Sequence, residues 1–268
     1  MKPIENYKEI NKASWNNKVP IHVASTFYDF PGFLNGKSSL NSIELNLLGD
    51  IQGKSILHLQ CHFGLDSLSL SRLGAHVTGV DLSDKAIEKA KELSQEIKSN
   101  TSFICCDLYD LPKYLDQQFD LVFTSYGTIG WLPNINKWSQ LIAHFLKPNG
   151  KFVFVEFHPV VWMFDDYFKE IKYNYFNKKA IVEKEEGTYA EKNAPIQQDY
   201  ISWNHSLSDV INNLIKNNIE ITSFEEFDYS PYDCFKETEK IEPGKFRIKH
   251  LKSKIPMVYS IVGIKKDG

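Results

Sequence analysis

Short apolar runs alternate with amphipathic segments through the middle of this chain. The runs contain six or seven residues and are typical of strands buried on both faces of a parallel sheet. Between them, apolar residues recur every three or four positions, as on the buried face of a helix. The pattern predicts strands at 55–60, 76–81, 101–107, 119–125 and 151–157, and helices at 66–73, 84–97 and 135–145.

The flanking segments are less regular. Residues 1–50 contain a helical pattern at 7–15, a turn-rich aromatic stretch at 27–32 and a second helical pattern at 40–48. Beyond Pro159, an aromatic stretch runs to about residue 200, and a helix at 207–217 and a strand at 220–227 follow. A last apolar run at 257–264 is expected to pair antiparallel at the end of the sheet.

This order of elements predicts an α/β fold with a Rossmann-like, doubly wound sheet that is mostly parallel. We expect one domain over residues 1–268. It divides into an N-terminal helical cap (1–50), a cofactor-binding core (51–159), an insertion after the fifth strand (160–200) and the last helix and strands (201–268).

Charge and composition exclude several classes of function. The chain has 268 residues with 31 Lys and Arg against 34 Asp and Glu, so it has no overall positive field to hold nucleic acid. It has neither an apolar N-terminal run nor eighteen successive apolar residues, which favours a cytoplasmic protein without a membrane span. The four cysteines form no CxxC pair, so we expect reduced thiols and no metal site.

The most informative stretch is Ile-Leu-His-Leu-Gln-Cys-His-Phe-Gly-Leu-Asp at 56–66, followed by Leu-Gly-Ala-His-Val-Thr-Gly-Val-Asp-Leu-Ser at 73–83. It predicts a strand, a turn containing Gly64, a helix and a second strand that ends at Asp81. Ligands of doubly wound sheets bind at the carboxyl ends of the strands, where a carboxylate can accept bonds from two ribose hydroxyls. The turn has one of the three glycines that a dinucleotide pyrophosphate requires, which argues against a nicotinamide enzyme.

These segments resemble the class I S-adenosylmethionine (SAM)-dependent methyltransferases. The family's first motif reads roughly V-L-D-L-G-C-G-T-G, and its second strand ends G-V-D-x-S. Further similar segments are Phe-Ile-Cys-Cys-Asp-Leu at 103–108, Phe-Asp-Leu-Val-Phe at 119–123 and Leu-Lys-Pro-Asn-Gly-Lys-Phe at 146–152. The resemblance covers about residues 50–160, with weaker agreement near 207–227 and 257–265. It implies a seven-stranded sheet, SAM as cofactor and in-line SN2 methyl transfer.

The resemblance also assigns cofactor residues. Asp81, with Leu82 beside it, would hold the ribose, and Asp107 or Leu108 the adenine. Gln60, His62, Gly64 and Ser125 would contact the remainder. His58 stands where the family has an acid, and Gln60 and His62 stand where it has glycines. Because SAM has no pyrophosphate to cradle, Gln60 or His62 can instead hydrogen-bond its amino-acid end.

Other residues are candidates for the acceptor pocket. Trp15 and Tyr28 would close it from above. The rings of Tyr126 and Trp131 either face the sulfonium or pack a loop. His158 is a candidate general base, with support of the loop before Pro159 as the alternative. His205 is expected to be structural.

The aromatic insertion is consistent with a lid over an apolar or aromatic acceptor, with a small satellite core or with a dimer contact. We expect the charge run at 183–186 to be a solvated face. The basic stretch at 245–254 is interpreted as a solvated loop, with an anionic substrate or RNA contact as the alternative. The hypothesis is methylation of a small molecule. The alternatives are a non-catalytic SAM or nucleoside sensor, and methylation of RNA or protein.

Overall fold

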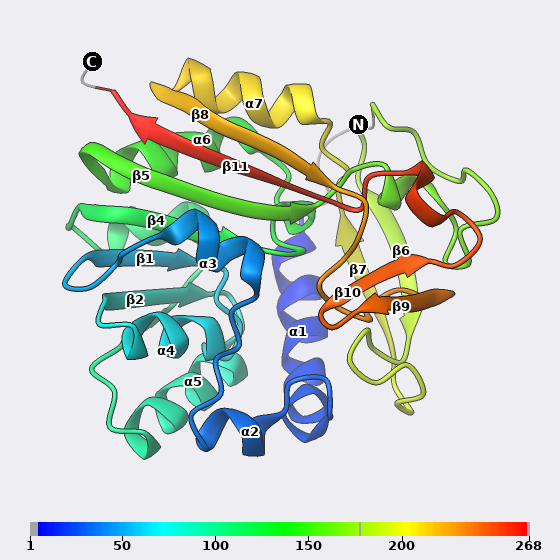
Figure 1. Ribbon diagram of the computed structural model, residues 1–268, viewed down its shortest axis with the longest axis horizontal. Coiled ribbons are helices and arrows are strands. Elements are labelled where there is room, and N and C mark those ends of the chain that lie inside the picture. Colours follow the sequence, from blue (N-terminus) through cyan, green and yellow to red (C-terminus); the bar gives the residue numbers. More distant parts are fainter. Residues whose placement is uncertain (1–4, 177, 267–268) are drawn as a thin grey trace.

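A seven-stranded sheet forms the centre of the molecule in the computed structural model, which describes residues 5–176 and 178–266 (Figure 1). Its strand order is β3-β2-β1-β4-β5-β11-β8. Strand β11 is antiparallel to both of its neighbours, and the other neighbouring pairs are parallel. The strands are β1 (Ser55–Leu59), β2 (His76–Asp81), β3 (Ser102–Cys105), β4 (Phe119–Ser125), β5 (Leu146–Phe157), β8 (Ile219–Phe227) and β11 (Val258–Lys265). The predicted Rossmann-like sheet with an antiparallel last strand is confirmed.

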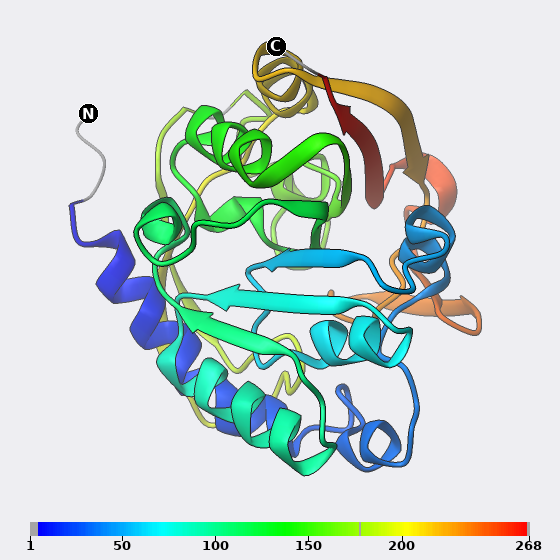
Figure 2. The ribbon, with the colours of Figure 1, turned by 90° about the vertical axis from the view of Figure 1, so that its left-hand side faces the viewer.

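Helices cover both faces of this sheet (Figure 2). Side chains alternate between the faces of a strand, so Leu57 packs toward α6 and α7, whereas Ile56 packs toward α3 and α4. Because helices cover both faces of the sheet, β5 has apolar side chains on both of its faces. The helices of these layers are α3 (Ser42–Leu48), α4 (Leu65–Arg72), α5 (Asp84–Glu96), α6 (Ile135–Phe145) and α7 (Leu207–Lys216).

The central elements agree closely with the sequence prediction, and the strand β5 shows the largest difference. It begins at Leu146, five residues before the predicted start at 151. The Lys-Pro-Asn-Gly segment does not form a free turn, because Leu146 already pairs with Phe119 and the register shifts before Lys151 pairs with Leu121. Asn149 absorbs the irregularity with a φ of 59°.

The N-terminal segment is more helical than predicted. Helix α1 (Tyr7–Ala24) extends nine residues beyond the predicted end at 15 and passes through Pro20. A short helix α2 (Phe30–Leu34) occupies part of the stretch expected to be turns, and Asp29 caps it by accepting a bond from the Gly32 N–H. Figure 1 shows α1 between the sheet and the smaller strands of the second half of the chain, and it packs against α5 and the strand β7 (Gln197–Ser202).

Two hairpins were not predicted. Strands β6 (Ile181–Glu186) and β7 (Gln197–Ser202) lie within the aromatic insertion, and β9 (Thr238–Glu242) and β10 (Lys245–Ile248) lie in the C-terminal segment. The basic stretch is therefore partly a strand, and its Arg247 pairs with Asp228. The prediction of a solvated face at 183–186 is wrong in part, because alternate side chains of β6 point toward the interior.

Candidate functional site

A cavity of about 1260 Å³ lies at the carboxyl ends of β1, β2, β4 and β5. Helix α1 and the insertion contribute the walls opposite the sheet. All but one of the site residues predicted from the sequence line this cavity. They are Trp15, Tyr28, Gln60, His62, Gly64, Asp81, Leu82, Asp107, Leu108, Ser125, Tyr126 and Trp131.

The first turn keeps a glycine-like backbone although it has one glycine. Gln60, His62 and Gly64 have φ values of 54°, 51° and 80°, a region that costs non-glycine residues free energy. The Gln60 side chain is fixed by a 2.8 Å bond from its Nε2 to the Thr128 carbonyl. Gly64 cannot be replaced, because a Cβ atom there would lie 2.7 Å from the Phe103 ring. The side chains of Gln60 and His62 therefore project from turn positions at which the methyltransferase motif has glycines.

Asp81 is held from behind by the backbone. One of its carboxylate oxygens accepts a 2.8 Å bond from the His62 N–H, and the other accepts a 2.8 Å bond from the Ser83 N–H. Burial raises the pKa of Asp81, and these N–H bonds oppose the rise. Because each carboxylate oxygen has two lone pairs, both oxygens can still accept a further bond from the cavity side.

A cluster of histidine and aromatic rings covers the first turn. His62 Nε2 lies 3.0 Å from Nδ1 of His22, and the Trp15 ring lies 5.1 Å from the His62 ring. The hydroxyl groups of Tyr28 and Tyr189 are hydrogen-bonded to each other. Burial lowers the pKa of His22 to about 3 and also lowers the pKa of His62, so both imidazoles are neutral. The sequence analysis missed His22 and Tyr189, because nothing local links α1 or the insertion to the first turn.

Glu156, at the end of β5, organises the loop that follows β4. Its carboxylate accepts bonds from the backbone N–H groups of Gly127, Thr128 and Ile129, and also from the Thr128 hydroxyl. The side chain is 2 % exposed. These bonds fix the loop that carries Tyr126 in the cavity wall.

Lys18 joins the cap to the insertion across the cavity. Its ammonium lies 2.7 Å from Glu185 Oε2 on β6, and the residue is 1 % exposed. The same ammonium lies 4.9, 5.5 and 6.0 Å from the ring centroids of Trp15, Trp131 and Tyr200. A buried cation needs such compensation, since burial in an apolar region strongly disfavours charge. No pattern in the sequence indicates this pair, because Lys18 and Glu185 are 167 positions apart.

His158 does not face the cavity. Its Nε2 lies 2.9 Å from Glu226 Oε1 on β8, and its Nδ1 accepts a bond from the Val160 N–H. The residue is absent from the cavity wall. The structure therefore does not place His158 where it could take a proton from a bound acceptor, because its ring points toward Glu226 of β8 although Phe157 and Pro159 on either side line the cavity. His205 is bonded through Nε2 to the Leu132 carbonyl at 2.7 Å, which fits a structural role.

The family model that matches this chain covers the same core. Residues 56–150 match the family model described as a methyltransferase domain. The chain is 27% identical over 232 residues to an uncharacterized protein of Haemophilus influenzae, which covers 79% of this chain and 87% of that protein. It is 34% identical over 104 residues to a ubiquinone biosynthesis O-methyltransferase of Coxiella burnetii, which covers 39% of this chain. The match spans 44% of that enzyme, less than half of its length.

Solved structures show the same fold at low sequence identity. The geranyl diphosphate C-methyltransferase from Streptomyces coelicolor has a TM-score of 0.62 at 15% identity, with 98% of this chain and 99% of that chain covered. A SAM-dependent methyltransferase from Mesorhizobium loti has a TM-score of 0.57 at 20% identity, with 87% and 100% covered. The matched domain, the strand order and the acid at the end of β2 agree: residues 56–150 match a methyltransferase domain, and the chain has the fold of SAM-dependent methyltransferases of known structure.

Proposed function

We propose that this enzyme transfers a methyl group from SAM to a small-molecule acceptor held inside the cavity. The observation that carries the proposal is the enclosure of the first turn and Asp81 by helix α1 and the insertion. The sulfonium of SAM supplies an activated methyl group. The protein then has mainly to align the acceptor with that group and to exclude water, and alignment alone supplies much of the acceleration.

The residues present fit SAM. Asp81 offers two free acceptor positions for the ribose hydroxyls. Asp107 lies at the start of the short helix that follows β3, where Leu108 can pack against the adenine. Gln60 Oε1 and His62 Nδ1 are buried and have no hydrogen-bond partner among the described residues. A buried polar atom without a partner costs free energy, so these two atoms are suited to the ammonium and carboxylate of the cofactor's amino-acid end.

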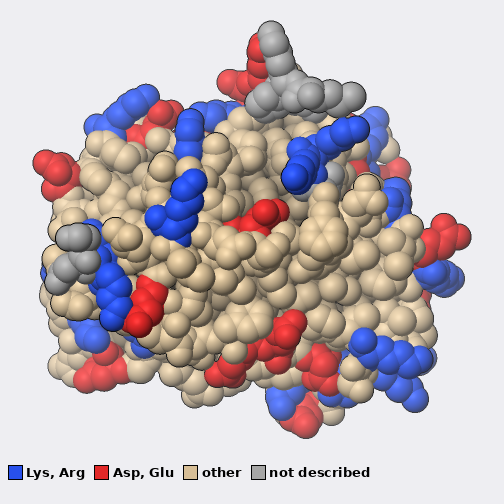
Figure 3. Space-filling model, turned by 90° about the horizontal axis from the view of Figure 1, so that it is seen from above, with Lys and Arg blue, Asp and Glu red and all other residues tan. Residues whose placement is uncertain are grey.

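A small acceptor fits better than a macromolecule. The insertion and α1 cover the cavity, and rings from both line it. On the face shown in Figure 3, basic and acidic side chains are interspersed and form no continuous basic patch. Nucleic acid binding depends on such patches. Among residues 5–176 and 178–266, no helix combines the length and the apolar character needed to cross a bilayer.

We further propose that the chain works as one domain. The cap at 1–50 and the insertion at 160–200 would then serve as the cover of the core at 51–159. The C-terminal part at 201–268 completes the sheet and adds Tyr232 to the cavity wall. The rings of the insertion are divided between the cavity and a satellite cluster at the end of β5, which includes Phe168.

The test is the affinity for SAM and S-adenosylhomocysteine, measured by calorimetry. We expect Asp81→Ala to weaken binding by at least about tenfold, because a hydrogen bond to a charged group contributes about 1.5–3 kcal/mol. The matched control is Asp116→Ala, at an exposed position beyond the cavity wall. Unchanged affinity in Asp81→Ala would contradict the ribose assignment. Absence of saturable binding to the wild type would contradict the proposed function, and binding without turnover of any acceptor would favour a sensor.

A further inference from the structure

Two carboxylates, the partly exposed Asp66 and the buried Glu44, line or support the part of the cavity next to α3. Asp66, on the first turn of α4, accepts bonds from the Ser39 hydroxyl at 2.6 Å and the Ser125 hydroxyl at 3.4 Å. Glu44, which is fully buried, accepts bonds from the Tyr126 hydroxyl at 2.7 Å and from the Asn41 N–H at 2.8 Å. All of these partners are neutral.

No counter-ion accompanies the two carboxylates. Within the described ranges, none of the ion pairs involves Asp66 or Glu44. His58, which also lines the cavity, is neutral because burial lowers its pKa to about 3, and its Nδ1 lies 2.7 Å from the Ser67 hydroxyl. Burial and the neighbouring Glu44 raise the pKa of Asp66 to about 6. An ionised Asp66 is therefore left with uncompensated charge, which a bound cation would relieve.

Several aromatic rings line the same cavity as Asp66. The ring of Tyr232 lies 5.1 Å from that of Tyr126 and is stacked 5.5 Å from that of Phe27. The charge of Asp66 contributes to the raised pKa values of Tyr28, Tyr126 and Tyr232, so all three hydroxyl groups lie within its field. Aromatic faces attract ammonium groups by about 0.5–2 kcal/mol. An acid at the base of several rings is the arrangement that recognises an organic cation.

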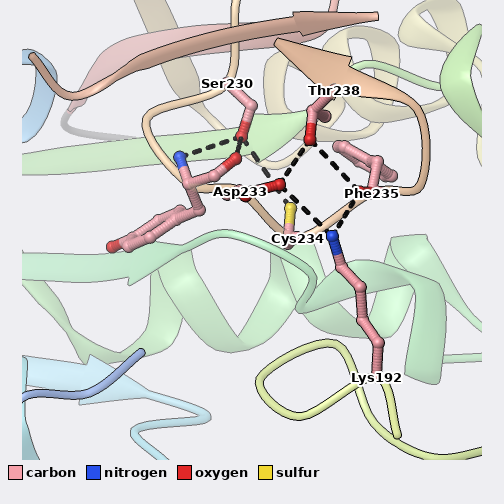
Figure 4. Close-up of polar contacts among 7 residues, drawn as sticks. Lys192, Ser230, Asp233, Cys234, Phe235 and Thr238 are labelled. Atoms are coloured by element: carbon pink, nitrogen blue, oxygen red, sulfur yellow. Dashed lines mark hydrogen bonds and ion pairs between the residues drawn. The ribbon is translucent and has the colours of Figure 1, made fainter. Parts of the chain in front are cut away.

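The loop that supplies Tyr232 is fixed rather than loose. The Ser230 hydroxyl donates to the Tyr232 carbonyl at 2.8 Å and accepts from the Tyr232 N–H at 3.0 Å (Figure 4). From the insertion, Lys192 donates to the Phe235 carbonyl at 2.8 Å and approaches Asp233 Oδ1 at 3.3 Å. These contacts hold Tyr232 in place without using the cavity side of its ring.

The cavity as a whole favours positive charge. Its wall contains ten aspartate and glutamate residues against six lysines and no arginine. We propose that the methyl acceptor carries a protonated amine next to an apolar or aromatic body, and that Asp66 is the residue that binds this amine. The inference rests on the proposed function, because it names the acceptor class for that site. Anionic acceptors such as diphosphates would be repelled by the same wall.

The experiment compares two ligands of nearly equal shape, phenethylamine and 2-phenylethanol. Both are titrated by calorimetry into enzyme saturated with S-adenosylhomocysteine. We expect the wild type to bind the amine at least about tenfold more tightly than the alcohol. The preference should increase from pH 5 to pH 7 as Asp66 loses its proton. Asp66→Asn should abolish the preference and its pH dependence, whereas Asp116→Asn, at an exposed position beyond the cavity wall, should keep both.

Three outcomes would overturn the inference. One is a wild type with no preference for the amine, which requires no variant and therefore does not depend on the folding of Asp66→Asn. Another is an amine preference that survives in a folded Asp66→Asn protein. The last is an Asp66→Asn protein that loses affinity for S-adenosylhomocysteine and keeps its amine preference, which would assign Asp66 to the cofactor's own ammonium. Normal binding of S-adenosylhomocysteine in the first case leaves the proposed function standing.

Discussion

At the scale of single residues, Glu156 shows how a buried charge shapes this site. The carboxylate is surrounded by N–H and O–H donors, so every one of its contacts is attractive. Charge-assisted bonds of this kind are about twice as strong as neutral ones. Glu156 therefore acts as the anchor of the loop between β4 and α6, and its role is positional.

The corresponding prediction concerns Glu156→Gln. The amide keeps the shape of the side chain but turns an NH₂ group toward backbone N–H donors, so at least one donor loses its partner. We expect a loss of about 2–3 kcal/mol in the free energy of unfolding, measured by urea denaturation. Glu225→Gln, on an exposed face of β8, serves as the control and should stay within about 0.5 kcal/mol of the wild type. Equal stability of both variants would contradict the anchoring role.

The sequence identified those site residues whose position follows from the sheet. Asp81 ends β2 and Gly64 lies in the turn between β1 and α4, and the carboxyl ends of parallel strands meet at one edge. The same rule finds only one of the two hydrogen-bond partners of Asp66, because Ser125 ends β4 whereas Ser39 precedes Asp66 by 27 positions. His158 was assigned to the cavity by the same strand-end rule. The rule does not say to which side a residue turns after its strand has ended.

At the scale of elements, helix α1 and the hairpin β6–β7 form one cover. The Asn11 side chain donates to the Ile201 carbonyl at 2.8 Å and accepts from the Ile201 N–H at 2.9 Å. Such a pair of bonds extends the pairing of β7 onto a helix. Lys18, which lies about two helical turns after Asn11 on α1, adds an ion pair with Glu185 of β6. Opening the cavity therefore requires both elements to move together.

Lys18→Met tests this connection. The variant keeps the apolar stem among the rings and removes the ammonium, so Glu185 loses its partner. We expect the free energy of unfolding to fall by about 1–3 kcal/mol and hydrogen exchange in α1 to become faster. The loss is smaller than for a fully buried pair, because Glu185 is 25 % exposed and can turn to solvent.

The double variant Lys18→Met/Glu185→Gln should recover part of that loss, since no uncompensated charge remains. Lys12→Met is the control, because Lys12 lies on the same helix and its 3.4 Å ion pair with Asp84 of α5 is exposed. It should change stability by less than about 0.5 kcal/mol. Strictly additive effects of Lys18→Met and Glu185→Gln would show that the pair does not couple the two elements.

The elements that were predicted correctly are those whose apolar residues follow a single regular pattern. The strands β1, β2 and β4 are apolar because both of their faces are covered, and α6 has a regular apolar face. The bounds of β4 and α6 match the prediction at both ends. Strand β6 was missed because its Glu-Lys-Glu-Glu segment has no apolar alternation. Its inward positions carry Glu183 and Glu185, which bond to Tyr200 and Lys18 through contacts that only the fold creates.

At the scale of the whole molecule, buried ionisable groups act against one another as the pH changes. Burial lowers the pKa values of His22 and His58 to about 3, so the folded protein keeps them neutral. Burial raises the pKa of Asp66 to about 6 and also raises those of Asp81 and Glu156. On acidification, the histidines favour the unfolded chain, which takes up their protons, whereas the carboxylates favour the folded chain. The total pH dependence is a difference between these two sets.

The difference in stability between the wild type and a histidine variant isolates the contribution of that histidine to the pH dependence. His58 is 3 % exposed, lies in the centre of the sheet on β1 and has the hydroxyl of Ser67 as its hydrogen-bond partner. Its folded pKa of about 3 lies below its ordinary value of 6.5. The stabilisation that it provides relative to a non-titrating side chain is therefore complete above pH 6.5. It decreases as the pH falls toward 3, because only the unfolded chain binds the proton in that interval.

We predict that the stability advantage of the wild type over His58→Asn shrinks by about 2 kcal/mol between pH 7 and pH 5, since one and a half pH units below 6.5 correspond to that free energy. Urea denaturation of both proteins at several pH values measures it. The carboxylates titrate in both proteins and cancel in the difference. His76→Asn, at the exposed start of β2, is the matched histidine control. If the stability curves of the wild type and His58→Asn were parallel, His58 would bind its proton in the folded protein as readily as in the unfolded chain. The core around β1 would then admit a charge, contrary to what its burial predicts.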